Sequence, residues 1–177
     1  MRPAIIPVLL MSSWYDVYVP TNFENLAGLS RGRHRPQVVM GPWTHGNRTK
    51  RVFGDVDFGP LATFDGNVGE SWTQFRIACF DRWFGGAGGR EDEPRGGEPA
   101  LRFFLMGGGS GRRTQAGKLD HGGRWISTSQ WPPAETEPTA FYLHEDGSLD
   151  TRSPVATDAA ITYNFDPAIP CRPSAAH

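Results

Sequence analysis

Two apolar runs with the composition of β-strands constrain the fold of this chain most strongly. The first runs from Ala4 to Met11 and the second from Gln37 to Met40. Continuous runs of Ile, Val and Leu are typical of strands that are buried on both faces, as in a parallel sheet. Between them, Pro20 to Leu29 carries apolar residues at helical spacing. The sequence therefore predicts a right-handed strand–helix–strand unit with two parallel strands.

An acid and a base follow these two runs. Asp16 ends the segment S-S-W-Y-D, and His45 ends the segment G-P-W-T-H. An Asp followed by a His, each just past a strand, is the second half of the Ser…Asp…His order of α/β-hydrolase triads. In such a triad the Asp orients the His, and the His takes the proton of the serine. We expect the side chains of Asp16 and His45 to lie within hydrogen-bond reach, at about 2.6–3.5 Å.

No serine of the chain meets the requirements of the nucleophile. That serine sits in a Gly-x-Ser-x-Gly turn between a strand and a helix. Ser12 and Ser13 lie beside the acid, Ser71 lacks the second glycine, and two residues after Ser110 comes Arg112. The sequence thus predicts a chain that carries the acid and the base without the nucleophile, and that is inactive alone.

A change of pattern separates the first part of the chain from the rest. Gly85 to Gly97 is rich in glycine and charge, which is typical of a linker and predicts domains over residues 1–90 and 98–170. A long loop from Gly46 to Asn67 and a helix from Val68 to Phe84 are expected before it. After it, short apolar segments between Gly- and Pro-rich turns indicate an antiparallel β-sandwich. These segments are Ala100 to Met106, Arg124 to Ser127, Thr139 to His144 and Ile161 to Phe165.

Composition excludes several classes of function. The net charge of −1, without a basic stripe, argues against nucleic acid or an anionic membrane as a partner. No apolar run approaches the roughly 18 residues of a membrane span. Cys79 and Cys171 lack the spacing of a zinc site or a disulfide framework, and Cys79 is interpreted as a small buried side chain. We expect a cytoplasmic location, unless an upstream region carries a signal sequence.

Weaker motifs are interpreted as structural. Asp55 and Asp57 offer two carboxylates but no further oxygen ligands, so a solvated loop is expected rather than a cation site. The glycine run Gly107–Gly111 lacks the lysine and helix of a phosphate-binding loop and predicts a turn. His121 and His144 are expected at the surface. Tryptophans are interpreted as packing residues at the domain junction rather than a carbohydrate platform; they are Trp43, Trp72, Trp83, Trp125 and Trp131.

Short motifs along nearly the whole chain resemble the cocaine-esterase-like hydrolases. This family includes the X-prolyl dipeptidyl-peptidases, the α-amino-acid ester hydrolases and related acylases. The motifs run in family order: W-Y-D (Trp14–Asp16), G-P-W-T-H (Gly41–His45), F-D-R-W-F (Phe80–Phe84), F-F-L-M-G (Phe103–Gly107), G-R-W (Gly123–Trp125), W-P-P (Trp131–Pro133), Y-L-H-E-D-G-S-L (Tyr142–Leu149) and Y-N-F-D-P (Tyr163–Pro167).

The resemblance implies a fold of class α/β plus all-β. The chain would hold the end of an α/β-hydrolase sheet, with two parallel strands and helices, followed by the start of a jelly-roll β-sandwich. Asp16 would be the triad acid and His45 the triad base. The family chemistry is cleavage of ester or amide bonds, X-prolyl peptide bonds included, through a serine acyl-enzyme, without a metal or organic cofactor.

The partners that the resemblance implies are a small-molecule ester, amide or peptide substrate in the intact enzyme, and an upstream chain that carries the nucleophile. On this resemblance the chain is expected to be a C-terminal fragment of a serine hydrolase. Two alternatives to this interpretation stay open: a non-catalytic β-sandwich binding module, and one half of a split hydrolase.

The last residues depart from the family pattern. After Pro170 the family would continue approximately as Val-Pro-Thr-Ile-Gly-Gly, whereas this chain reads Cys171 to His177. The codons of that segment, read one base out of frame, permit the family continuation. We therefore expect a frameshift near Pro170 and an unrelated tail over residues 171–177.

Overall fold

The computed structural model of the chain describes residues 6–31, 36–84 and 101–155, together with 160, 162, 164 and 166–168. Its contacts divide the chain into two compact units, one of which extends to Trp131 while the other is Pro132–Pro173. The predicted boundary at Gly85 to Gly97 and the predicted tail lie outside the described residues, as does most of the predicted strand from Ile161 to Phe165. These three stay predictions.

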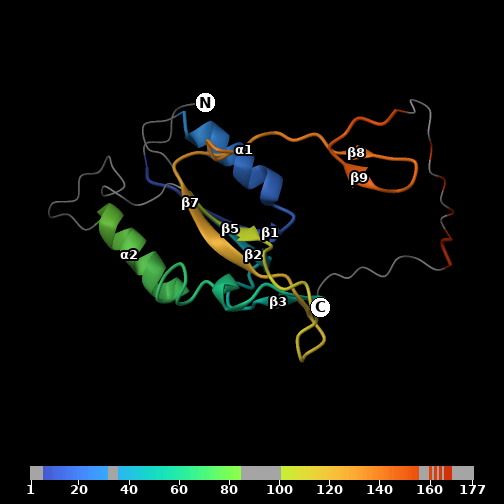
Figure 1. Cartoon of the computed structure of the whole chain (residues 1–177). Helices are drawn as coiled ribbons and strands as arrows, with labels where there is room; N and C mark the ends of the chain where they lie inside the picture. Colours follow the sequence, from blue (N-terminus) through green and yellow to red (C-terminus); the bar gives the residue numbers. More distant parts are fainter. Residues whose placement is uncertain are drawn as a thin grey trace. The chain divides into compact units, whose positions relative to one another are not determined.

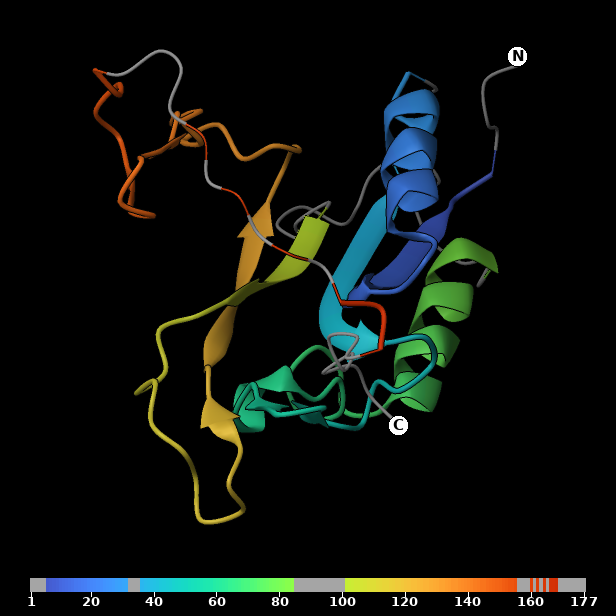
Figure 2. The ribbon, with the colours of Figure 1, turned by 90° about the vertical axis from the view of Figure 1, so that its right-hand side faces the viewer.

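A four-stranded sheet is the centre of the first unit (Figures 1 and 2). Its strand order is β1 (Leu9–Tyr15), β2 (Gln37–Thr44), β5 (Leu101–Met106) and β7 (Gly123–Thr128). β1 and β2 are parallel, as predicted for the two apolar runs. β5 is parallel to β2, and β7 is antiparallel to β5.

The position of β5 corrects the expectation of a separate antiparallel sandwich. β5 joins the sheet of the first two strands, with Leu101 opposite Val38 and Phe103 opposite Met40. The physical reason is that β5 is apolar on both faces: Leu101, Phe103 and Phe104 are all buried. A strand of this kind is stable in the interior of a sheet, where both faces are covered. The sheet is therefore mixed.

Helix α1 (Val19–Leu29) connects β1 to β2, as the periodicity predicted. Pro20 stands in its first turn, where a missing N–H costs nothing. Leu26 is buried and Phe23 half-buried, and they pack against the face of the sheet that carries Leu10 and Val38.

Helix α2 (Trp72–Phe84) lies on another side of the sheet from α1 (Figure 1). Cys79 faces inward and is buried, as predicted. Three large apolar side chains of the same helix remain exposed: Ile77 at 46%, Phe80 at 55% and Phe84 at 74%. One apolar face of α2 is therefore left uncovered by the described part of the chain.

The segment between β2 and α2 is not the long loop that was expected. It contains β3 (Val52–Phe53), β4 (Val56–Asp57) and the 3₁₀ helix η1 (Pro60–Ala62). β4 also pairs with β6 (Leu119–Asp120), which forms a three-stranded sheet in the order β3-β4-β6. Partners that lie far away in the sequence thus order this segment, and a local pattern does not reveal them.

Three weaker expectations have mixed outcomes. Asp57 is buried rather than solvated: its carboxylate accepts the Gly59 N–H at 2.9 Å and lies 3.5 Å from the guanidinium of Arg51. The glycine run Gly107–Gly111 connects β5 to β6 and has positive φ at three positions, which confirms a turn-like connection. His121 is half-buried against Phe58 rather than at the surface.

The second unit contains one described hairpin, formed by β8 (Tyr142–Leu143) and β9 (Leu149–Asp150). The strand predicted from Thr139 is thus only two residues long. His144, expected at the surface, is half-buried, and its Nε2 has no hydrogen-bond partner among the described residues.

Candidate functional site

Asp16 and His45 meet at the ends of two neighbouring parallel strands. Asp16 follows β1 directly, and His45 follows β2 directly. The Nδ1 atom of His45 lies 2.8 Å from the Oδ2 atom of Asp16. This distance confirms the predicted contact, while the catalytic role of the two residues stays a prediction.

The Asp16 carboxylate is held from two sides. Its side chain is only 7% exposed, and its second oxygen, Oδ1, accepts the backbone N–H of Tyr18 at 3.0 Å. Burial raises the pKa of Asp16, but the hydrogen bonds from Tyr18 and His45 and the charge of His45 together outweigh burial, so the pKa lies below its ordinary value. The ionised carboxylate accepts hydrogen bonds only, which places the ring proton of His45 on Nδ1. The Nε2 atom is then free to act as a base.

The ring of His45 is open to the surroundings. Its side chain is 74% exposed, and the ring of Tyr18 lies against it edge-on, with the centroids 5.6 Å apart. A nucleophile supplied from elsewhere could therefore reach the imidazole. Sequence reasoning missed Tyr18, although its position two residues after the acid is the usual place for a backbone N–H that caps an Asp side chain.

The lowered pKa of Asp16 predicts a pH-dependent contribution to stability. Asp16→Asn should destabilise the fold at neutral pH, because a neutral amide replaces the ionised acceptor. The folded pKa lies below the reference value of 3.8, so the advantage of Asp16 over the asparagine variant is present above about pH 4 and is lost as the pH falls further. Urea unfolding of both proteins between pH 7 and pH 2 measures this.

A matched control for that measurement is Glu135→Gln, since Glu135 is exposed in the second unit. This variant should follow the parent protein at every pH. A stability difference between parent and Asp16→Asn that is as large at pH 2 as at pH 7 would contradict the coupling of Asp16 to its donors.

The four serines considered as nucleophiles have structural positions. Ser12 and Ser13 lie within β1 and are each 4% exposed. The hydroxyl of Ser71 accepts the N–H of Gln74 at the start of α2, and the hydroxyl of Ser110 donates to Asp120 at 2.7 Å. None of these four serines stands on a turn between a strand and a helix beside His45.

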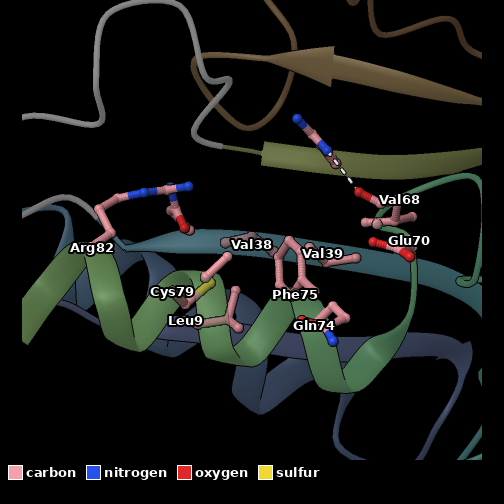
Figure 3. A pocket seen from close by; sticks show the side chains of 13 residues that line it. Leu9, Val38, Val39, Val68, Glu70, Gln74, Phe75, Cys79 and Arg82 are labelled. Atoms are coloured by element: carbon pink, nitrogen blue, oxygen red, sulfur yellow. Dashed lines mark hydrogen bonds between the residues drawn. The ribbon is translucent and has the colours of Figure 1, made fainter. Parts of the chain in front are cut away.

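A pocket of about 480 Å³ lies between α2 and the sheet (Figure 3). Leu9 and Gln37 line it, and they are the first residues of β1 and β2, whereas Asp16 and His45 follow the last. The pocket is therefore separate from the Asp16–His45 pair. Apolar side chains form its inner wall, and two guanidinium groups border it. The labelled residues are Leu9, Val38, Val39, Val68, Glu70, Gln74, Phe75, Cys79 and Arg82.

The described part of the chain contains no group of three or more His, Cys, Asp or Glu side chains that could hold a metal ion. Within the same residues, no helix has the length and apolar character needed to cross a membrane.

Comparison with known proteins connects both parts of the chain to one group. Residues 96–176 match the family model of the X-Pro dipeptidyl-peptidase C-terminal non-catalytic domain. Over 172 residues the chain is 31% identical to cocaine esterase from Rhodococcus sp. (strain MB1 Bresler), a match that covers 93% of this chain and 26% of that protein. The chain thus spans about a quarter of the length of this relative. The family-model match extends over residues 171–176, the segment for which the frameshift is predicted.

Proposed function

We propose that the chain belongs to the hydrolase family of cocaine esterase and the X-Pro dipeptidyl-peptidases, and that Asp16 and His45 are the acid and the base of a Ser-His-Asp triad. The observation that carries this proposal is the 2.8 Å contact between Nδ1 of His45 and Oδ2 of Asp16. Both residues precede residue 96, where the match to the non-catalytic domain begins. The match to cocaine esterase covers too much of the chain to be confined to that domain.

In the proposed enzyme, β1, α1 and β2 belong to an α/β-hydrolase sheet, which β5 and β7 extend. His45 Nε2 takes the proton of a serine hydroxyl as the serine attacks the carbonyl carbon of an ester or amide. Asp16 keeps the ring in the required tautomer and stabilises the imidazolium that forms. His45 then returns the proton to the leaving group, and water releases the acyl group by the same steps in reverse. The serine comes from a part of the enzyme outside these 177 residues, or from a separate chain.

An uncovered apolar surface supports the proposal that the chain works together with another part of the enzyme. Ile77, Phe80 and Phe84 of α2 are exposed, and the pocket beside α2 is bordered by the apolar face of β1 and β2. Large apolar surfaces of this kind normally contact another layer of protein. We therefore expect the chain to associate when it is alone and concentrated, so that measurements on the chain by itself are made in dilute solution.

Complementation tests the proposal. The chain is co-expressed with the portion of Rhodococcus cocaine esterase that this match leaves out, and hydrolysis of a p-nitrophenyl ester is measured. We expect turnover only when both parts are present. Each part alone is the first control, and co-expression with the Asp16→Asn chain is the second. If a stable complex forms without turnover, the triad assignment is wrong; turnover by the chain alone would also contradict it.

A second candidate is a non-catalytic binding module, which the description of the matched domain favours. In the second unit, the hairpin β8–β9 exposes Leu143 and Leu149, at 62% and 64%. Binding of a peptide or sugar by the residues after Gly97 alone, without any need for Asp16 or His45, would favour this function.

A further inference from the structure

The pairing of β1 with β2 contains an irregularity immediately before the candidate site. The two strands pair residue by residue from Leu9 opposite Gln37 to Ser13 opposite Gly41. The next pair is Tyr15 opposite Thr44, so one residue of β1 stands against two of β2. This is a β-bulge, a feature that occurs next to active sites and redirects side chains there.

The bulge decides which residue stands opposite Asp16. If the regular pairing continued past Ser13, Asp16 would stand opposite Thr44, and His45 would lie one residue further along. Since successive side chains of a strand point to opposite faces, His45 would also point to the other face of the sheet at that level. With the bulge, Asp16 and His45 are next to each other, and their side chains are in contact.

The residues of β2 at the bulge are suited to it. Pro42 has no N–H to donate to a neighbouring strand, and bulges are among the few strand positions where proline is tolerated. Gly41 makes room for Trp43: a Cβ atom on Gly41 would lie only 2.2 Å from the ring of Trp43. The ring can fold back over the strand only because residue 41 is glycine.

The contacts of Trp43 hold the bulge in place on one face of the sheet. Its side chain is fully buried, and its indole N–H donates to the carbonyl oxygen of Ala62 in η1 at 2.6 Å. The rings of Phe64 and Trp125 pack against it, with centroids 6.1 and 5.7 Å away. The bulged residue is thus bound to a different element of the fold.

Trp14 is the single residue of β1 that stands opposite the bulge. Its side chain is also held by a hydrogen bond and by ring packing. Its indole N–H donates to the carbonyl oxygen of Phe104 in β5 at 2.7 Å. Its ring packs against Phe23 of α1 and against Trp131. Each of the two tryptophans precedes a candidate triad residue by two positions, and each is held by a short hydrogen bond to a backbone carbonyl of another element.

We propose that this bulge, formed by Trp14 opposite Pro42 and Trp43, is the positioning element of the Asp16–His45 pair, and that the indole N–H of Trp43 fixes it. This proposal rests on the proposed function in one respect only, namely that the Asp16–His45 pair serves catalysis. Its geometric content, that the N–H of Trp43 keeps His45 against Asp16, is testable in the 177-residue chain without any activity.

The test replaces Trp43 with β-(3-benzothienyl)alanine, an isostere in which sulfur takes the place of the indole N–H. This variant retains the ring and should fold where a smaller residue fails. The tautomer of His45 is measured by ¹⁵N NMR on histidine-labelled chain above pH 8. The parent protein should show mainly the Nδ1–H form, and the variant should shift by about tenfold towards Nε2–H, the effect of losing one hydrogen bond.

Trp125 provides a matched control, because its indole N–H donates to the neighbouring carbonyl of Leu61 at 2.8 Å while Trp125 lies outside β1 and β2. The same isostere at residue 125 should leave the His45 tautomer unchanged. An unchanged tautomer in the Trp43 variant overturns the proposal. An equal shift in both variants overturns it too, because the effect would then come from general loosening around η1. Failure of complementation with an intact tautomer effect would instead refute the proposed function and leave the positioning role standing.

Discussion

In the complemented enzyme, His45→Ala is expected to lower kcat for ester hydrolysis by about 10⁴- to 10⁶-fold, with a small change in KM. The base is needed in both the formation and the breakdown of the acyl-enzyme, while substrate binding depends on other surfaces. Asp16→Asn should cost about 10⁴-fold, because the amide no longer selects the Nδ1–H tautomer of His45. Steady-state kinetics on a p-nitrophenyl ester measures both effects.

His144→Ala is the matched control for this loss, since His144 is a half-buried histidine of the second unit, whereas Asp16 and His45 belong to the first. It should retain the kcat of the parent complex. The double variant of Asp16 and His45 should be little worse than His45→Ala alone, because residues of a triad act as a unit. Additive losses, or a His45→Ala enzyme with nearly full kcat, would exclude His45 as the base.

The sequence alone was sufficient to predict the strands and the helix that surround the candidate site. The apolar runs before Asp16 and His45 predicted two parallel strands, and the stripe of Phe23 and Leu26 predicted the helix between them. Both features arise from residues close together in the chain, where apolar periodicity reports burial directly. The contact of Asp16 with His45 followed from the rule that neighbouring parallel strands end at the same edge of a sheet.

The features that sequence reasoning missed depend on partners far away in the chain. β5 pairs with β2 although Leu101 and Val38 are 63 residues apart, and the buried Asp57 lies in β4, which pairs with the distant strand β6. The bulge at Pro42 differs from these features, because the residues that permit it, Gly41 and Pro42, are neighbours in the sequence. A proline within an apolar strand could have indicated the bulge, since proline is excluded from regular interior strands.

The largest stability effect is expected for Trp43→Ala. Trp43 is fully buried, so the substitution removes its packing with Phe64 and Trp125 and leaves a cavity, at a cost of about 3–5 kcal/mol. The carbonyl of the buried Ala62 also loses its donor. Since domains are stable by only about 5–15 kcal/mol, this loss approaches the total. Urea unfolding should show a much lower midpoint with an unchanged m-value.

Trp131→Ala separates this effect from the general cost of losing an indole. Trp131 is 39% exposed, although its ring lies 4.7 Å from that of Phe23 and 5.3 Å from that of Phe103. It keeps part of its contact with water in the folded state, so its removal should cost less, about 1–2 kcal/mol. Equal losses for the two variants would mean that Trp43 is not a special anchor. A larger loss for Trp43, accompanied by loss of the Nδ1–H tautomer of His45 at urea concentrations where the sheet is still folded, would connect the stability of the bulge to the geometry of the catalytic pair.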